Sequence, residues 1–322
     1  MGKVVELKPT KSAAKKPRAA RSRPRQRRSR TALVLGGGGF TGGVYEIGAL
    51  RALDLLSVNR TVNQFDVYVG TSAGSFVAAM TANGITPEEM MRVVNQQVPS
   101  PFRDVDLNQL LRPNILEFLV KGALLPVRAA GVVRQLAGQI GGISAMDVIL
   151  GLAEGLPSGL YSGSGIEEYV RMVLSDPDRT DDFRLLDNEL YLAATDLDTC
   201  ERVVLGGKDW DDIPISTAVR ASTALPMVYK PVRIRDREFI DGGIVSTTNI
   251  DIAVEAGAKF IIVVNPLVPY VNDFKKMIPT ALGSRVRRVS DMGFPQIGYQ
   301  AFKLLAHQRL HEAVSHLSLI HI

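Results

Sequence analysis

Residues 65–74 have the sequence Phe65-Asp-Val-Tyr-Val-Gly-Thr-Ser-Ala-Gly74, and they carry the clearest structural signal in the chain. Its first five residues form a short apolar run that predicts a buried strand, and the residues from Ala73 onward predict a helix. The pattern G-x-S-x-G, Gly70 to Gly74, lies at the turn between them. This is the context of a nucleophile elbow, in which a tight turn presents a serine hydroxyl at the carboxyl edge of a sheet. Ser72 is therefore a candidate nucleophile.

Three further apolar runs predict strands in the same sheet. They are Thr31–Leu35, residues 191–195 and Phe260–Val264. A helix is expected after the glycines that follow Leu35, through Leu53, and residues 254–258 have the composition of a helix end. Strands that alternate with helices indicate an α/β fold with a parallel sheet covered on both faces.

Residues 99–157 interrupt this alternation with apolar clusters and isolated basic residues. Two interpretations remain open: ordinary helical packing on the core, and a lid or interfacial patch whose bases face phosphate head groups. We therefore expect a basic tail at 1–30, an α/β domain at 31–268 that carries the helical insertion, and a C-terminal helical extension at 269–322. An amphipathic helix is predicted in that extension, near residues 297–310.

The charge of the chain is distributed unevenly. Residues 1–30 contain twelve Lys or Arg and one acid, net +11, whereas the remainder contains twenty-six bases and thirty-two acids, net −6. The tail has too few large apolar side chains to offset its ordering entropy, so it is predicted to be disordered. A solubilising tail, an electrostatic anchor on anionic lipid, a nucleic-acid contact and an organelle-targeting peptide are the interpretations left open.

The sequence also bears on the compartment. Its one cysteine, Cys200, allows no intrachain disulfide and favours a reducing environment. The sequence contains no apolar run of about 18 residues, so no transmembrane helix is predicted. The N-terminus lacks the apolar region of a secretory signal. We therefore expect a cytoplasmic protein, peripheral at an anionic membrane if the tail is an anchor. Nucleic acid is not an expected partner, and the oligomeric state is not predicted.

A glycine run, Gly36-Gly-Gly-Gly-Phe-Thr-Gly42, follows the first predicted strand. Such a run lets the backbone approach a ligand and point several N–H groups at one place. Those donors could stabilise an oxyanion, but the same residues also fit the dinucleotide fingerprint G-x-G-x-x-G. The fingerprint requires an acid at the end of a second strand, and neither Asp54, in a predicted helix, nor Asp66, inside a strand, is so placed. No Gly-Lys-Ser/Thr follows, which excludes a phosphate-binding P-loop.

The histidines restrict the kind of serine chemistry that is available. All four lie near the C-terminus, so none is placed among the strands that would form a Ser-His-Asp site. Ser72 needs another base, and Asp241, in Asp241-Gly-Gly243 after a strand-like segment, is the candidate. An aspartate of ordinary pKa is a poor base, so this pairing requires burial. His307 and His311 could share a metal, but without a third ligand a solvated helix face is the preferred interpretation, and no metal is expected.

With these motifs in order, the chain resembles the patatin-like phospholipase family of bacterial and plant lipid acyl hydrolases. The matching stretches are residues 37–42 with 48–50, 70–74, 194–198, 221–226 and 241–243. The resemblance covers about residues 31–268. It implies a three-layer α/β/α sandwich with a central, mainly parallel sheet, a Ser72–Asp241 dyad, and an oxyanion hole formed by Gly37, Gly38 and Gly39. It implies no metal and no cofactor.

The resemblance further implies cleavage of lipid esters, as a phospholipase A, lysophospholipase or esterase, through an acyl-enzyme on Ser72. The glycines expected to shape these loops are Gly42, Gly70, Gly74, Gly242 and Gly243. The family often has a basic residue where this chain has Thr41, and this departure bears on rate or phospholipid preference. Two alternatives remain: a lipid-binding or membrane-associated regulatory protein on the same fold with little turnover, and a nucleotide-binding protein that uses the glycine loop.

Overall fold

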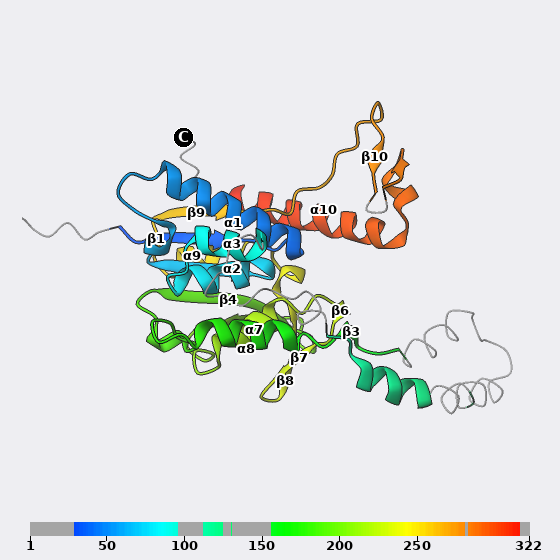
Figure 1. Ribbon diagram of the computed structural model, residues 1–322, viewed down its shortest axis with the longest axis horizontal. Helices are drawn as coiled ribbons and strands as arrows, with labels where there is room; N and C mark the ends of the chain where they lie inside the picture. The colour runs from blue at the N-terminus through cyan, green and yellow to red at the C-terminus, as the bar shows by residue number, and fades with distance from the viewer. Residues whose placement is uncertain (1–28, 96–111, 125–129, 131–155, 281–282, 316–322) are drawn as a thin grey trace, which may run out of the picture.

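The computed structural model describes residues 29–95, 112–124, 130, 156–280 and 283–315 (Figure 1). Residues 1–28 of the predicted basic tail and most of the predicted insertion at 99–157 lie outside these residues. Of the insertion, residues 112–124, 130, 156 and 157 are described, and residues 115–124 form a helix. Within the described part of the chain, no helix combines the length and apolar character needed to cross a membrane.

The core of the molecule is a seven-stranded sheet in the order β7-β8-β4-β2-β1-β9, with β5 also paired to β4. Four strands run parallel to one another: β1 (Thr31–Leu35), β2 (Val67–Thr71), β4 (Glu189–Asp196) and β9 (Phe260–Val264). Three are antiparallel additions: β5 (Arg202–Leu205), β7 (Val232–Ile234) and β8 (Arg237–Asp241). The predicted parallel centre is therefore confirmed, within a sheet that is mixed at one side.

Helices cover both faces of this sheet (Figure 1). One face carries α1 (Gly39–Leu56), α2 (Ala73–Ala82), α3 (Pro87–Asn95), α7 (Ser164–Leu174) and α8 (Ile215–Ser222), and the other carries α9 (Ile250–Glu255) and α10 (Phe294–Ser315). The alternation of side chains along β1 explains this division. Leu33 and Leu35 pack with the first set of helices, while Ala32 and Val34 pack with α9 and the end of α10. The predicted three-layer α/β fold is confirmed.

Two small sheets lie outside the core. β3 (Gly159–Tyr161) pairs in parallel with β6 (Met227–Tyr229), and β10 (Ile278–Pro279) pairs antiparallel with β11 (Arg285–Val286). Short 3₁₀ turns connect several elements: η1 (Val62–Gln64), η2 (Phe183–Leu185), η3 (Gly242–Ile244) and η4 (Val289–Met292).

The predicted boundaries differ from the observed ones in places. β2 begins and ends two residues later than predicted, because Gly70 and Thr71 continue the ladder with β4. Asp66 instead accepts a hydrogen bond from the Thr31 amide at 2.8 Å, which ties the entry of β2 to that of β1. The predicted helix end near residue 255 is confirmed, and Gly257 (φ +81°) closes it in the left-handed conformation that favours glycine.

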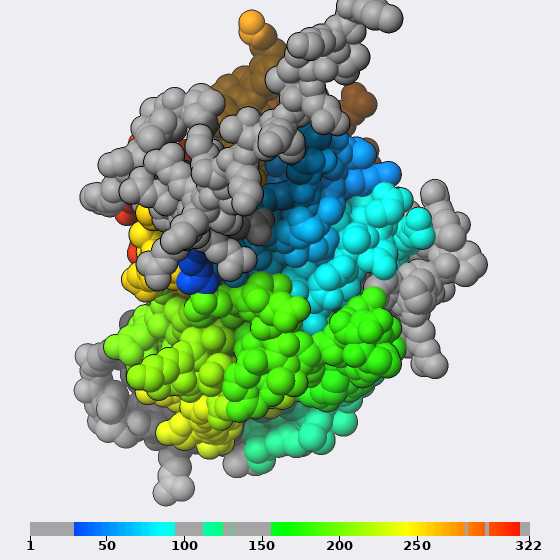
Figure 2. Space-filling model, turned by 90° about the vertical axis from the view of Figure 1, so that its left-hand side faces the viewer, coloured from blue at the N-terminus to red at the C-terminus, as the bar shows by residue number. Residues whose placement is uncertain are grey.

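Figure 2 shows the side of the molecule where the chain enters β1, on the left in Figure 1. The blue, cyan and green segments, which include α1, α2, α3 and α7, form a continuous surface there. The motif loops lie at the opposite end of the strands, the carboxyl edge, which is where ligands bind in open α/β sheets.

Candidate active site

The register of β4 brings the two predicted catalytic residues together. β2 pairs with β4 up to Thr71 opposite Ala193, and β8 pairs with β4 from Asp241 opposite Ala194. β5 pairs with residues 192–195, which overlap both segments, so β5 occupies the other edge of β4. β2 and β8 therefore share one edge and meet end to end. Because β8 runs antiparallel, the last residue of each strand lies at the same point.

The turn at the end of β2 has the geometry that a nucleophile elbow would have. Ser72 has φ +55° and ψ −124°, a conformation that side chains rarely adopt and that is found at functional turns. A Cβ added at Gly70 would lie 2.5 Å from the Ser75 Cα, and one added at Gly74 would lie 2.4 Å from the Leu35 carbonyl oxygen. Both flanking positions therefore require glycine because neighbouring backbone fills the space.

Ser72 and Asp241 are in direct contact. The Ser72 Oγ donates a hydrogen bond to Asp241 Oδ2 at 2.6 Å, and the Gly243 amide donates to Asp241 Oδ1 at 2.7 Å. The Asp241 side chain is 2% exposed. This burial raises the pKa of Asp241 to about 6, although the hydrogen bonds from Ser72 and Gly243 act in the opposite direction. The site thus supplies the enclosed, more basic carboxylate that a serine–aspartate pair requires.

The glycine loop lies beside the serine. A Cβ added at Gly37 would lie 3.3 Å from Ser72 Cβ, so the loop backbone passes directly over the nucleophile. The Gly37 amide donates to the Thr247 carbonyl at 3.2 Å. For the amides of Gly38 and Gly39, no acceptor is found among the residues described. These two N–H groups stand at the start of α1, where the helix dipole favours negative charge.

Close packing requires glycine at Gly242 and leaves little room for a side chain at Gly42 and Gly243. A Cβ at Gly242 would lie 2.2 Å from the Ala193 carbonyl oxygen, and one at Gly42 would lie 3.1 Å from Pro266 Cγ. At Gly243 the added atom would lie 3.0 Å from Asp241 Oδ1. A side chain at Gly243 would therefore press on the carboxylate that faces Ser72.

Sequence reasoning did not assign a role to Ser222, which the structure places directly behind the elbow. The Ser222 Oγ accepts a hydrogen bond from the Ser72 amide at 3.0 Å and donates one to the Ala193 carbonyl at 2.6 Å. Ser222 is fully buried. It lies within residues 221–226, a stretch that the resemblance had already singled out, so that match was the available signal.

Asn249 is a second residue that the sequence did not indicate. Its side-chain amide donates to Thr71 Oγ1 at 2.9 Å and to the Ser246 carbonyl at 2.8 Å, and its Oδ1 accepts from Arg202 at 2.9 Å. Asn249 is buried and has φ +42°, a left-handed conformation that asparagine tolerates. It joins the residue before Ser72 to the loop after Asp241.

Glu46, on α1, is a buried carboxyl outside the dyad. Its side chain is fully buried, and neither carboxyl oxygen has a hydrogen-bond partner. Burial raises the pKa of Glu46 well above its usual value, and the nearby Gly36 amide offsets only part of this effect. Burial beside Gly36 therefore favours the neutral form of the Glu46 carboxyl.

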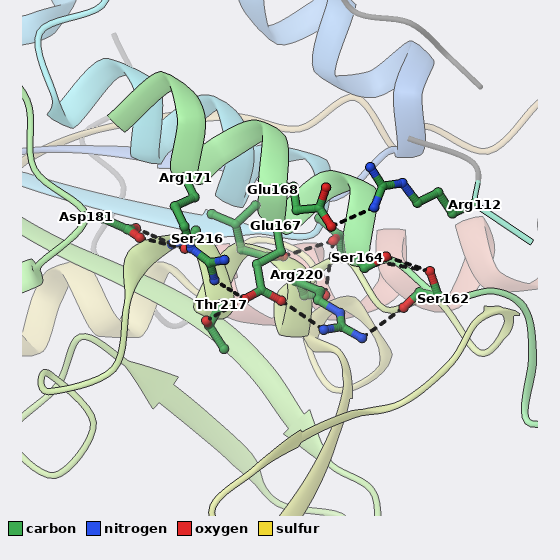
Figure 3. Close-up of polar contacts among 12 residues, drawn as sticks. Arg112, Ser162, Ser164, Glu167, Glu168, Arg171, Asp181, Ser216, Thr217 and Arg220 are labelled. Atoms are coloured by element: carbon green, nitrogen blue, oxygen red, sulfur yellow. Dashed lines mark hydrogen bonds and ion pairs between the residues drawn. The ribbon is translucent and has the colours of Figure 1, made fainter. Parts of the chain in front are cut away.

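An ionic network fixes the helices behind the elbow (Figure 3). Arg220, on α8, donates to Glu167 of α7 at 2.8 Å and to the Ser162 carbonyl at 3.0 Å. Arg171 also pairs with Glu167. Burial would raise the pKa of Glu167, but Arg220 and Arg171 more than compensate, and the pKa is lowered. Since Arg220 lies two residues before Ser222, the network holds α8 in register with the elbow.

The predicted histidine pair lies apart from this site. His307 and His311 are exposed on α10. Within the described ranges, no group of three or more His, Cys, Asp or Glu side chains is arranged to hold a metal ion.

Known proteins share this sequence pattern. A sequence model of the family described as "Patatin-like phospholipase" matches residues 33–254, more than half of the chain. "Probable lipid hydrolase 463L" of Invertebrate iridescent virus 6 is 23% identical over 229 residues, which cover 69% of this chain and 63% of that protein. This chain therefore spans less than two thirds of the relative's length.

Two solved structures are also similar. VipD from Legionella pneumophila aligns with 16% identity and a TM-score of 0.34, over 67% of this chain and 46% of that one. The type III effector protein ExoU aligns with 15% identity and a TM-score of 0.34, over 88% of this chain and 53% of that one. By the match of the family sequence model across residues 33–254, this chain belongs to the patatin-like phospholipase family.

Proposed function

We propose that this protein is a serine acyl hydrolase that cleaves carboxylic ester bonds of lipids, with Ser72 as nucleophile and Asp241 as base. One observation carries the proposal: the 2.6 Å hydrogen bond from the Ser72 hydroxyl to a buried carboxylate, at the end of a strained strand-to-helix turn. Family membership supports a lipid substrate, and phospholipid is the class that we expect.

In the proposed acylation step, Ser72 Oγ attacks the ester carbonyl carbon while Asp241 Oδ2 takes the hydroxyl proton. The carbonyl oxygen becomes an oxyanion, for which the amides of Gly38 and Gly39 are available donors. When the tetrahedral intermediate collapses, the C–O bond to the leaving alcohol breaks and Asp241 returns the proton to that oxygen. A water molecule then attacks the acyl-enzyme with Asp241 again as base, releasing the fatty acid and regenerating Ser72.

The raised pKa of Asp241 supports this role for an aspartate. With a pKa of about 6, the carboxylate is ionised at neutral pH and yet more basic than an exposed aspartate. Its second oxygen is held by the Gly243 amide, so Oδ2 is the oxygen that can exchange a proton with the serine. Deacylation and acylation therefore use one and the same oxygen.

The test is intact-mass measurement after reaction with a fluorophosphonate, in the presence of detergent–phospholipid micelles. We expect one adduct on the parent protein, none on Ser72→Ala and a much slower reaction of Asp241→Asn. Ser57→Ala, at the end of α1 and the opposite edge of the sheet, is the matched control and should react like the parent. No adduct on folded parent protein, together with retained phospholipid binding, would instead support the lipid-binding alternative.

A further inference from the structure

A projecting segment of the molecule begins at the wall of the candidate active site. Pro266 and Leu267 follow β9 and lie against the glycine loop. A Cβ added at Gly37 would lie 3.6 Å from Leu267 Cδ1, and one added at Gly38 would lie 2.7 Å from Pro266 Cγ. From there residues 268–280 and 283–293, which we call the arm, run outward, form β10 and β11, and return to α10. The arm is orange and stands out from the body in both Figure 1 and Figure 2.

The arm is tied internally and at its base. Its two limbs are joined by the β10–β11 pairing and by the Asn272 side chain, which donates to the Arg287 carbonyl at 2.9 Å. At the base, Tyr270 and Gln300 of α10 exchange hydrogen bonds of 3.2 and 2.7 Å. The same helix reaches the dyad loop, where Phe302 Cζ would lie 3.5 Å from a Cβ at Gly243. The position of the arm is therefore coupled to that of the site.

The outer surface of the arm is unusually apolar. Val271 is 87% exposed and Phe274 is 79% exposed, and Val268, Tyr270 and Met277 are also exposed. Large apolar side chains gathered on one exposed segment mark an interaction surface rather than a solvated one.

The arm is also basic, in contrast to the folded body. Residues 268–293 contain five Lys or Arg and two acids, net +3, whereas the rest of residues 31–322 contains twenty-one bases and thirty acids, net −9. The five bases are Lys275, Lys276, Arg285, Arg287 and Arg288. Lys276 lies 3.7 Å from Asp273 and is still 83% exposed, and for the other four no ion pair is found among the described residues.

We propose that the arm docks this protein on a lipid surface that carries anionic head groups. Val271 and Phe274 would enter the boundary between head groups and acyl chains, and the neighbouring bases would meet lipid phosphates. A nucleic acid would engage the bases but leave Val271 and Phe274 in water. Docking through the arm places the carboxyl edge of the sheet, with Ser72, toward the lipid. The docking surface does not depend on the chemistry of the dyad.

The decisive experiment reports insertion of one side chain, so that binding through residues 1–28 does not obscure it. In the full chain with Cys200→Ser and Ser72→Ala, an environment-sensitive nitrobenzoxadiazole dye is attached at Phe274→Cys. The matched control carries the dye at Leu55→Cys, which is also 79% exposed but lies at the end of α1, on the opposite edge of the sheet. Vesicles are phosphatidylcholine with or without phosphatidylglycerol.

With phosphatidylglycerol vesicles, the dye at position 274 should brighten, shift to the blue and be quenched by spin-labelled lipid, while the dye at position 55 should not respond. Lys275→Glu/Lys276→Glu should lower the vesicle partition coefficient by about thirtyfold or more, at about fivefold for each charge removed. Arg60→Glu/Lys259→Glu, two exposed bases remote from the arm, should lower it by less than about twofold.

Four results would overturn the proposal. The first three are a dye at position 274 that stays in water while the protein is vesicle-bound, equal responses at positions 274 and 55, and no vesicle binding at all. A response that requires another protein rather than lipid would assign the arm to a protein partner and would also overturn the proposal.

Fluorophosphonate labelling of Ser72 in the Lys275→Glu/Lys276→Glu protein should equal that of the parent. Loss of docking and failure of the dyad are thereby distinguished.

Discussion

The substitution Asp241→Asn should stabilise the fold at alkaline pH while it removes the proposed base. Burial raises the pKa of Asp241 from its usual 3.8 to about 6, so the folded protein binds this proton more tightly than the unfolded chain does. The stability linked to this carboxyl is fully present below the unfolded pKa and is lost as the pH rises through about 6. At 1.36 kcal/mol per pKa unit, the ionised carboxylate costs about 3 kcal/mol of unfolding free energy above that pH.

Asparagine can occupy the same site without that cost. Its Oδ1 can accept from the Gly243 amide and its side-chain NH₂ can donate to Ser72 Oγ, so the geometry is kept while the charge is absent at every pH. The free energy of unfolding of Asp241→Asn relative to the parent should therefore increase by about 3 kcal/mol between about pH 3.5 and about pH 8.

The measurement is urea unfolding across this pH range, followed by the fluorescence of Trp210, the only tryptophan, which packs edge-on against the buried Phe239. Asp196→Asn is the control of opposite sign. Asp196 is also buried, but the Thr199 amide, with the Asp198 amide and Arg237, lowers its pKa, so its replacement should lose stability as the pH rises. If the difference in unfolding free energy between Asp241→Asn and the parent does not change with pH, the pKa of Asp241 is not raised in the folded protein.

Three other outcomes follow from the structure. Gly74→Ala should lower the free energy of unfolding by roughly 2–4 kcal/mol through its clash with backbone. At Gly48, in α1, an added Cβ would have no heavy atom within 4 Å, so Gly48→Ala should raise the free energy of unfolding by about 0.5–1 kcal/mol. If urea unfolding gave the same change for Gly74→Ala and Gly48→Ala, the packing argument would be contradicted. Ser222→Ala should lower kcat on a soluble short-chain ester by on the order of 10- to 100-fold with little change in KM, because the Ser72 amide loses its hydrogen-bond acceptor. A parental kcat in stopped-flow assays would exclude a positioning role for Ser222. Glu46→Gln should raise Tm at about pH 8 and not at about pH 4, because a raised pKa in the folded protein costs stability only above the pKa of the unfolded chain, where the unfolded carboxyl ionises. Calorimetry that shows the same shift in Tm at both pH values would be inconsistent with this.

Local patterns were sufficient to predict the parallel centre of the fold. β1 and β9 are predicted to the residue, because each is a largely apolar run with a basic residue before it and a glycine or asparagine after it. The antiparallel strands β5 and β7 are four and three residues long and mix arginine with apolar residues. Such short segments carry no periodicity of their own, and their positions are set by pairing with β4 and β8.

The candidate site could also be predicted only in part. Ser72, Asp241 and the flanking glycines were predicted because tight turns restrict which residues can occupy them. The hydrogen bonds that support these turns were not predicted, because their partners are far apart in the sequence. Ser222 and Ser72 are separated by 150 residues, and Asn249 and Thr71 by 178. Serine and asparagine are common in loops, so their type alone gave no signal, and only the tertiary arrangement identifies these contacts.

The end-to-end meeting of β2 and β8 along β4 determines when during synthesis the contact between Ser72 and Asp241 can first form. The two residues are 169 positions apart in the chain. A polypeptide still emerging from the ribosome can form the elbow as soon as β4 is in place, but the position beside Ala194 is filled only after residues 237–241 have been made. An unfinished chain that ends before β8 therefore carries the turn at Ser72 without the Asp241 carboxylate. Under the proposed mechanism such a chain is inactive, and hydrolysis begins only after β8 has paired with β4.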